Sequence, residues 1–215
     1  MGTRGVSNFI ARLEKEQKAH VAFLGGSITE NKNGHTKMLS EWLRSQWPNV
    51  GFTFTNAGLA STCSTAGAFR VERDVFSQGQ VDLLVVEFAV NDDQDAKHDR
   101  RTAIRGLEGI IRQYFEANPT GDVISVQFVN PEILAKAQAG EEAGWVAESL
   151  DRLAAGASEQ ELHIFLGLAP RRLGKADLRL GAGDLAAAEA ARPGWNPSGW
   201  SIDGAARVLA LLVHG

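Results

Sequence analysis

The chain has 215 residues, of which 44% are hydrophobic and 22% are charged, and its formal net charge is −4. These proportions are typical of a folded globular protein and indicate neither disorder nor a membrane protein. The acidic balance argues against nucleic-acid binding, because proteins that bind nucleic acids carry a basic face that displaces counterions from phosphates. We expect residues 1–215 to form a single domain with its own hydrophobic core.

The beginning of the chain carries no export signal. Residues 1–19 are rich in Arg, Lys and Glu and lack the continuous apolar stretch of a secretory leader. No apolar run in the sequence approaches the ~20 residues needed to cross a bilayer. We therefore expect a cytoplasmic protein without a membrane segment. The single cysteine, Cys63, excludes an internal disulfide framework, and we expect it to be a small buried residue.

Short apolar runs alternate with helix-like stretches, a rhythm that predicts an α/β fold with a parallel sheet. The first strand is expected at His20–Leu24, followed by a helix at His35–Trp47 with apolar residues on one face. A second strand is expected at Phe52–Thr55, where aromatic residues alternate with threonine. The nearly continuous apolar run Val81–Val90 is typical of a central strand covered on both faces.

The second half of the chain continues the pattern less clearly. A helix is expected at about Arg100–Glu116, a fourth strand at Asp122–Val129 and a weaker fifth strand at Leu162–Leu168. Apolar residues at helical spacing predict a further helix around residues 145–153. Beyond Ala169 the periodicity fades, so the last ~45 residues are atypical of the fold.

Polar clusters follow the first three predicted strands. They are Gly25–Glu30, Asn56–Gly58 and Asn91-Asp92. In open parallel sheets, ligands bind outside the carboxyl ends of the strands, where loops from neighbouring strands converge. If the first strand lies between the second and the third, all three clusters meet at one place.

These clusters supply what an acyl-transfer site requires. Ser27 follows two glycines on a tight turn and is the candidate nucleophile. Negative charge develops on the former carbonyl oxygen of the substrate, and preorganised donors must meet it. The backbone N–H groups of Ser27 and Gly58 and the side-chain amide of Asn91 are the candidates for this oxyanion hole.

The segments Phe23–Thr29, Asn56–Gly58 and Val86–Asp92 resemble, in order and spacing, the first three sequence blocks of the SGNH (GDSL-like) hydrolases. The resemblance spans roughly residues 19–140 and is strongest to the branch whose first block reads Gly-Gly-Ser-Ile-Thr. It implies a flavodoxin-like three-layer α/β/α sandwich with a parallel sheet of about five strands. It also implies esterase, lipase or carbohydrate O-deacetylase activity on a small ester such as an acetylated carbohydrate, without metal or cofactor. The family's serine, glycine and asparagine fall on Ser27, Gly58 and Asn91.

In the last block, this sequence departs from the pattern of that family. The family has Asp-x-x-His, in which the histidine activates the serine, whereas Asp203 is followed by Gly-Ala-Ala. Asn196, which precedes Pro-Ser, occupies the position at which the family's sequence block has histidine. One hypothesis is a pseudoenzyme or a serine with a different base, and the other is a shifted reading frame in the last quarter of the gene. The alternative function is a catalytically silent module that binds carbohydrate or another small ligand.

The five histidines have structural explanations. His20 and His163 open predicted strands, His35 begins a predicted helix and His214 lies next to the last residue. His98 stands among aspartates, a pattern that favours a solvated acidic loop over a metal site. The sequence therefore predicts no metal and leaves the general base unidentified.

Overall fold

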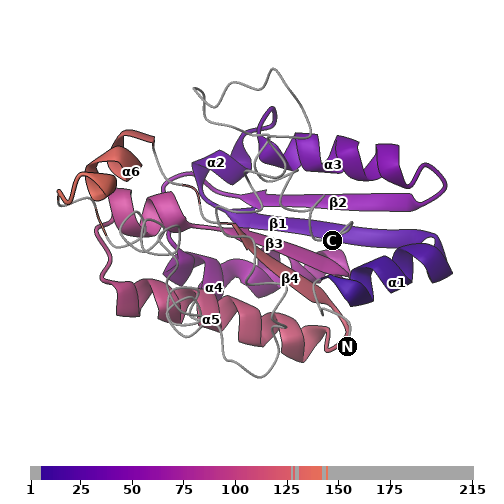
Figure 1. Ribbon diagram of the computed structural model, residues 1–215. Coiled ribbons are helices and arrows are strands. Elements are labelled where there is room, and N and C mark those ends of the chain that lie inside the picture. The colour runs from indigo at the N-terminus through magenta and orange to yellow at the C-terminus, as the bar shows by residue number, and fades with distance from the viewer. Residues whose placement is uncertain (1–5, 127, 129–130, 142–143, 145–215) are drawn as a thin grey trace, which may run out of the picture. The chain divides into compact units, whose positions relative to one another are not determined.

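The computed structural model describes residues 6–126, 128, 131–141 and 144. The chain divides into two compact units, Val6–Phe128 and a second one made of residues 1–5 and 129–215. In the second unit the described residues form one helix, α6, Pro131–Gln138. All other labelled elements belong to the first unit (Figure 1). A single domain over residues 1–215 stays a prediction.

Four parallel strands form the sheet of the first unit, in the order β2-β1-β3-β4. They are β1 Lys18–Gly25, β2 Gly51–Gly58, β3 Leu83–Glu87 and β4 Asp122–Val126. The first strand thus lies between the second and the third, as the convergence of the three polar clusters requires. The predicted parallel sheet is confirmed, and the fifth predicted strand, Leu162–Leu168, lies outside the described residues.

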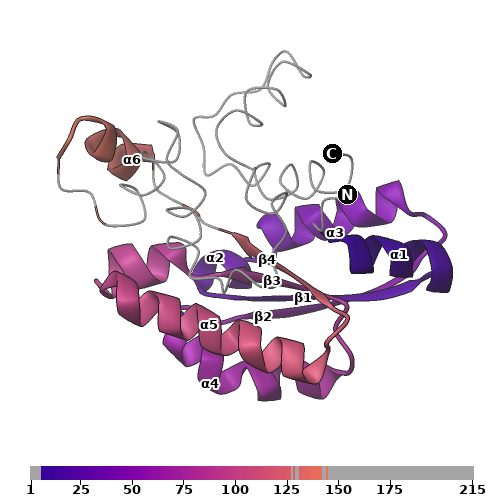
Figure 2. The same ribbon diagram turned by 60° about the horizontal axis from the view of Figure 1, so that its bottom comes forward.

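Helices cover both faces of the sheet, which gives the predicted three layers (Figure 2). Helices α1, Ser7–Glu16, and α3, His35–Gln46, lie on one face. Helices α4, Ser64–Asp74, and α5, Arg100–Ala117, lie on the other. The structure therefore confirms the predicted helices before β2 and before β4, and their ends differ from the predicted ones by single residues.

Three short helical elements lie between the strands and the long helices. The helix α2, Ser27–Glu30, follows β1, and the π-helix η2, Val90–Asp95, follows β3. A 3-10 helix, η1, Phe76–Gln78, precedes β3. Two of these elements thus begin where a strand reaches its carboxyl end, which is the edge at which the sequence predicts the site.

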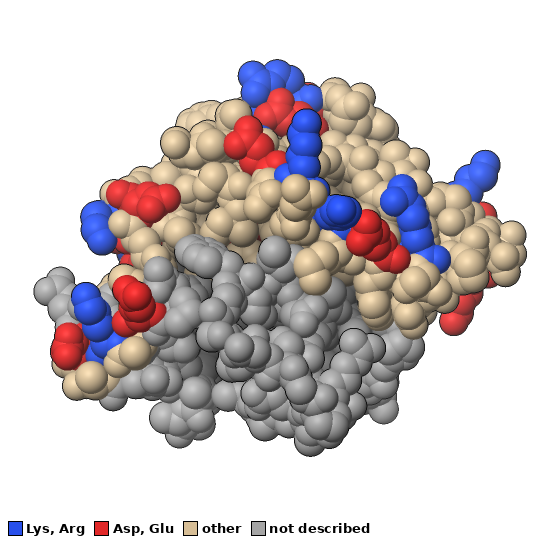
Figure 3. Space-filling view, turned by 90° about the horizontal axis from the view of Figure 1, so that it is seen from above, with Lys and Arg blue, Asp and Glu red and all other residues tan. Residues whose placement is uncertain are grey.

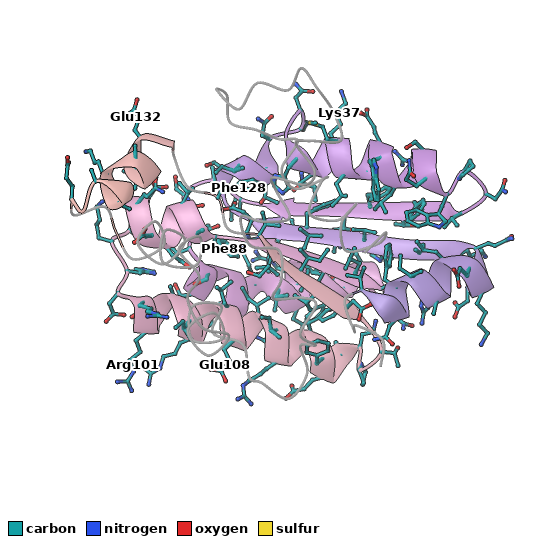
Figure 4. All side chains as sticks on the ribbon, in the orientation of Figure 1. Lys37, Phe88, Arg101, Glu108, Phe128 and Glu132 are labelled. Atoms are coloured by element: carbon teal, nitrogen blue, oxygen red, sulfur yellow. The ribbon has the colours of Figure 1, made fainter. Side chains whose placement is uncertain are left out.

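Several charged side chains of α3 and α5 point away from the sheet. Figure 4 shows Lys37 projecting from α3, and Arg101 and Glu108 projecting from α5 on the opposite side. On the face seen in Figure 3, acidic and basic side chains of the described residues are interspersed. Among the described residues, no helix combines the length and the apolar character that crossing a membrane requires.

The core is built on the alternation of side chains along β1. Ala22 and Leu24 belong to the buried cluster that includes side chains of α4 and α5, and Phe23 between them contacts the ring of His35 on α3. Because successive side chains of a strand point to opposite faces, β1 is apolar on both sides and buried from Ala19 to Gly25. The buried members of the cluster are Ala22, Leu24, Ala57, Val71, Val75, Val81, Leu84, Val86, Phe88, Leu107, Ile110 and Tyr114.

Helices α4 and α5 approach each other closely at one glycine. A Cβ atom on Gly106 would lie 2.7 Å from the carbonyl carbon of Ser64 and 2.7 Å from the backbone nitrogen of Thr65. The hydroxyl of Ser64 also donates to the carbonyl of Ala103 at 3.2 Å. The absent side chain of Gly106 therefore lets the first turn of α4 lie directly on α5.

The structure corrects several predicted boundaries. The third strand is shorter than Val81–Val90, because the chain adopts helical dihedral angles at Ala89 and continues into η2. The second strand is longer than Phe52–Thr55, since it stays paired with β1 as far as Gly58. Asn56–Gly58 is thus the end of a strand and not a turn after it. The fourth strand ends at Val126 instead of Val129, and the sequence did not predict α1 or α4.

We expect Gly106→Ala to lower the free energy of unfolding by about 1–3 kcal/mol, because the added methyl group meets backbone atoms that cannot rotate away. Gly109→Ala on the same helix is the matched control, since its Cβ would meet only the Cβ of Ala68, at 3.3 Å. Urea unfolding followed by circular dichroism compares the two variants. Equal stability of the two would contradict the close approach of α4 and α5.

Candidate active site

Three strands end in register at one edge of the sheet. Gly25, the last residue of β1, is paired with Gly58 of β2 and with Glu87 of β3. Ser27 begins α2 shortly after Gly25, and Asn91 lies in η2 shortly after Glu87. The predicted site residues therefore leave the sheet at the same edge, from neighbouring strands.

The turn after β1 touches the turn after β3. A Cβ atom on Gly26 would lie 2.6 Å from Cγ of Asn91, so only glycine fits beside this side chain. Asn91 is 2% exposed, and its Nδ2 donates to Oδ2 of Asp95 at 3.0 Å. Its Oδ1 is buried and has no hydrogen-bond partner among the described residues. The residue before Ser27 is thus in direct contact with Asn91.

The end of β2 touches α2. A Cβ atom on Gly58 would lie 2.5 Å from Cα of Glu30, and Nδ2 of Asn56 donates to the carbonyl of Thr29 at 2.8 Å. Asn56 therefore ties β2 to the short helix that begins with Ser27. The structure brings the three predicted segments together at the sheet edge.

Two of the three predicted oxyanion donors already have acceptors. The N–H of Gly58 donates to Oδ1 of Asn56 at 2.9 Å, which is the Asx-type bond that the asparagine makes two residues ahead. One amide hydrogen of Asn91 is used by Asp95, and an amide nitrogen carries two. Ser27 is exposed and is the first residue of α2, where N–H groups have no acceptor within the helix.

Arg70 on α4 holds the ends of two strands, and sequence analysis missed it. Its Nη2 donates to the carbonyl of Gly25 at 2.9 Å, and its Nη1 donates to the carbonyl of Ala57 at 2.7 Å. The guanidinium is 6% exposed, and Asp74 lies 3.0 Å from Nη1. A planar fork of N–H donors suits two neighbouring carbonyls in a way that a lysine would not. The sequence holds no signal for this role, because α4 itself was not predicted.

A buried carboxyl lies beneath the turn that carries Ser27. Glu87 is 1% exposed, and its Oε2 accepts a hydrogen bond from Oγ1 of Thr29 at 3.5 Å. Burial raises the pKa of Glu87 to about 7, and the charge of Asp92 acts in the same direction. Hydrogen bonds from Thr29 and from the backbone of Val90 oppose this rise in the pKa. The carboxyl therefore exchanges its proton near neutral pH.

The acidic segment after β3 is not the solvated loop that the sequence predicts. Asp92 is 1% exposed and Asp93 is 5% exposed, although Asp95 and Asp99 are exposed. Oδ1 of Asp92 accepts from the backbone N–H of Ser64 at 2.9 Å and so caps α4, a helix that is distant in sequence. Asp92 is therefore buried against the start of α4.

The described histidines occupy structural positions. His20 lies with Nε2 2.8 Å from Oγ1 of Thr55, as expected for a residue inside a strand. His35 begins α3 and packs between the rings of Phe23 and Phe128, at centroid distances of 6.2 and 5.4 Å. Burial lowers the pKa of His35 to about 4, so its ring is neutral at physiological pH.

Ser27 makes no hydrogen bond to a histidine among the described residues. Asn196, Asp203, His163 and His214 lie outside the described residues, and so does the family's last sequence block. The general base that a serine hydrolase requires is therefore not among the contacts of Ser27 that the structure describes.

The chain is similar to one protein family and to several solved structures. The family model for the metabolite traffic protein EboA matches residues 127–214. A two-domain esterase active on acetylated mannans, crystallised with mannopentaose, matches with 22% identity and a TM-score of 0.56. That match covers 98% of this chain and 54% of the esterase.

Axe2, an acetylxylan esterase from Geobacillus stearothermophilus, matches at 19% identity with a TM-score of 0.42, over 50% of this chain and 58% of that enzyme. No curated protein matches this chain in sequence. The chain spans about half the length of the two-domain esterase that it matches, and the likeness between the two shows a shared fold.

We expect Arg70→Ala to lower the free energy of unfolding by about 1–3 kcal/mol, because two buried strand-end carbonyls lose a donor. Arg70→Lys should recover little of that loss, since an ammonium group does not reach both carbonyls in a fixed fork. Arg73→Ala is the matched control on the same helix, because Arg73 is exposed, and it should unfold like the unchanged protein. Denaturant unfolding measures all three variants, and equal stability of Arg70→Ala and Arg73→Ala would refute the role of Arg70.

The stability of the protein should depend on pH through Glu87. In the unfolded chain this carboxyl ionises near pH 4.5, whereas in the folded chain it keeps its proton up to about pH 7. The folded state therefore binds more protons between these values, and stability falls as the pH rises through this window. Relative to Glu87→Gln, the unchanged protein should lose on the order of 3 kcal/mol.

Unfolding curves of both proteins, recorded below and above this window, measure the difference. Glu72→Gln, which changes an exposed carboxyl on α4, should follow the unchanged protein at every pH. Parallel pH profiles of Glu87→Gln and the unchanged protein would show that Glu87 is ionised throughout.

Proposed function

We propose that this protein is an ester hydrolase of the SGNH type in which Ser27 is the nucleophile. The observation that carries the proposal is the meeting of three segments at one sheet edge: Gly26 lies against Asn91, and Gly58 at the end of β2 lies against α2. The short helix that begins with Ser27 therefore lies next to Gly58 of β2, and the residue before it lies next to Asn91 of η2.

The reaction is an acyl transfer. The Oγ of Ser27 attacks the ester carbonyl and its proton passes to a base, so that the carbonyl oxygen becomes an oxyanion. Collapse of this intermediate breaks the bond to the alcohol, which takes up a proton and leaves. Water then hydrolyses the acyl-serine, which releases the acid and restores the hydroxyl.

Asn91 is the best supported of the oxyanion donors. Its bond to Asp95 fixes the amide plane and uses one amide hydrogen, and we propose that the second one donates to the substrate oxygen. Burial of this side chain against Gly26 keeps it in one position, which is what electrostatic preorganisation needs. The N–H of Ser27 is a second donor. The N–H of Gly58 already donates to Asn56, so it acts as an oxyanion donor only when the substrate oxygen shares its hydrogen.

The substrate class that we propose is a small ester, in particular an acetylated carbohydrate. Support comes from the fold shared with the two-domain esterase, which acts on acetylated mannans. The sequence blocks around Ser27, Gly58 and Asn91 support the same class through the branch of the family that they resemble.

A second candidate is a catalytically silent module that binds carbohydrate or another small ligand. Two observations favour it: the sequence has Asp203-Gly-Ala-Ala where the family has Asp-x-x-His, and the matched EboA family is described by metabolite traffic. The same match runs through residues 127–214 in the frame as given, which argues against a shifted reading frame in the last quarter of the gene.

A fluorophosphonate probe with intact-mass detection distinguishes the two candidates. An active serine hydrolase should bind one probe molecule covalently at Ser27, and Ser27→Ala should remain unlabelled. Asn91→Ala should lower the hydrolysis of an acetyl ester by ~100-fold or more, because it removes one oxyanion donor.

Asn49→Ala, which changes an exposed asparagine just before β2 and so at the opposite end of the sheet, is the control for Asn91→Ala and should retain full activity. Absence of labelling in the folded protein would favour the silent binding module. Labelling with unchanged turnover in Asn91→Ala would remove this residue from the oxyanion hole.

A further inference from the structure

Three potential metal ligands from different segments lie together behind Asn91. Cys63 directly precedes α4, Asp92 lies in η2, and His98 lies in the loop before α5. One ligand atom from each of the three side chains lies within 4.8 Å of the other two. None of the three residues is the proposed nucleophile or an oxyanion donor.

The separations in this cluster suit a tetrahedral metal centre. Oδ1 of Asp92 lies 3.4 Å from Nδ1 of His98. Zinc bonds of about 2.0–2.1 Å to nitrogen and oxygen and of about 2.3 Å to sulfur place neighbouring ligand atoms roughly 3.3–3.6 Å apart. The carboxylate and the imidazole already have that separation, and the thiol lies within 4.8 Å of both.

We propose that Cys63, Asp92 and His98 bind a divalent transition-metal ion, with zinc as the best fit. Thiolate, imidazole and carboxylate together are a donor set that zinc accepts, whereas calcium and magnesium prefer oxygen ligands alone. Three protein ligands leave a fourth position of the tetrahedron for water. This site is independent of the function proposed for Ser27.

Contacts around the cluster hold its ligands in place. Oδ1 of Asp92 accepts from the backbone N–H of Ser64, and the backbone N–H of His98 donates to the carbonyl of Asp92 at 2.8 Å. Such outer contacts orient metal ligands and raise the affinity of a site. Asp92 is 1% exposed, whereas Cys63 and His98 are partly exposed, which leaves an entry path for the ion.

The electrostatic surroundings favour a cation. Asp92 is 1% exposed, and Asp95 lies in the same element, η2. A divalent cation would compensate the buried charge of Asp92, and its binding would release the proton of the Cys63 thiol.

A bound ion would link the start of α4 to η2. Sγ of Cys63 lies 3.6 Å from the carbonyl oxygen of Asn91, so the ion would sit close to the backbone of that residue. Because α4 also carries Arg70, the ion would fasten the helix that holds the ends of β1 and β2. Its expected role is structural.

Metal titration of the reduced, chelator-treated full chain tests the proposal. Zinc should bind with one equivalent in competition with a chromophoric chelator, and cobalt should give a sulfur-to-metal charge-transfer band with tetrahedral visible bands. Cys63→Ser should abolish the charge-transfer band, and both Cys63→Ser and His98→Ala should weaken zinc binding by ~100-fold or more.

Asp95→Asn is the matched control, because it removes one negative charge from the same segment without removing a proposed ligand. It should bind zinc within a few-fold of the unchanged protein. Zinc should also raise the melting temperature of the unchanged protein but not that of Cys63→Ser, with circular dichroism of the metal-free chains confirming that both are folded. Equal zinc affinity of Cys63→Ser, or a cobalt spectrum without the charge-transfer band, overturns the proposal.

Discussion

The hydrogen bonds of the Arg70 guanidinium hold together the sheet edge at which the proposed site lies. Buried carbonyl groups at the ends of strands need hydrogen-bond donors, and the carbonyl of Gly25 accepts from the backbone N–H of Leu59 at 3.0 Å as well as from Arg70. Arg70 serves Gly25 of β1 and Ala57 of β2 with one planar group, and Asp74 balances its charge. The two strands therefore end together, and Ser27 starts its helix from a fixed point.

Close approach of the backbone at Gly26 then brings the turn after β1 into contact with η2. Without a side chain on Gly26, Asn91 packs directly beside the turn that carries Ser27. The polar groups that gather there are buried: Glu87, Asn91 and Asp92 are each at most 2% exposed. Burying a carboxyl disfavours its charged form, and perturbed acids of this kind gather at functional sites. The edge thus concentrates polar groups at a free-energy cost that packing in the core offsets.

The parallel sheet and the meeting of the three polar clusters were predictable, because continuous apolar runs and the residues that end them are local features. The prediction failed where a role depends on partners distant in sequence. Helix α4 lacks a broad apolar stripe, so neither the helix nor Arg70 was foreseen. Asp92 was expected in a solvated loop, because nothing near it in sequence announces that it caps α4. The sequence also does not indicate that Cys63 lies near Asp92 and His98, because these residues are distant from it in the chain.

The two candidate functions differ in the base and share the sheet edge. The proposed nucleophile and oxyanion donors come from the segment between Gly25 and Asp95, whereas a base of the SGNH type would come from the last block. A change in the tail could therefore remove turnover while the edge keeps its geometry. The buried Oδ1 of Asn91, which has no partner in the described residues, costs about 1–3 kcal/mol when unsatisfied. The close packing of Gly26 against Asn91 outweighs that cost, so the edge keeps its polar groups in place whether or not Ser27 reacts.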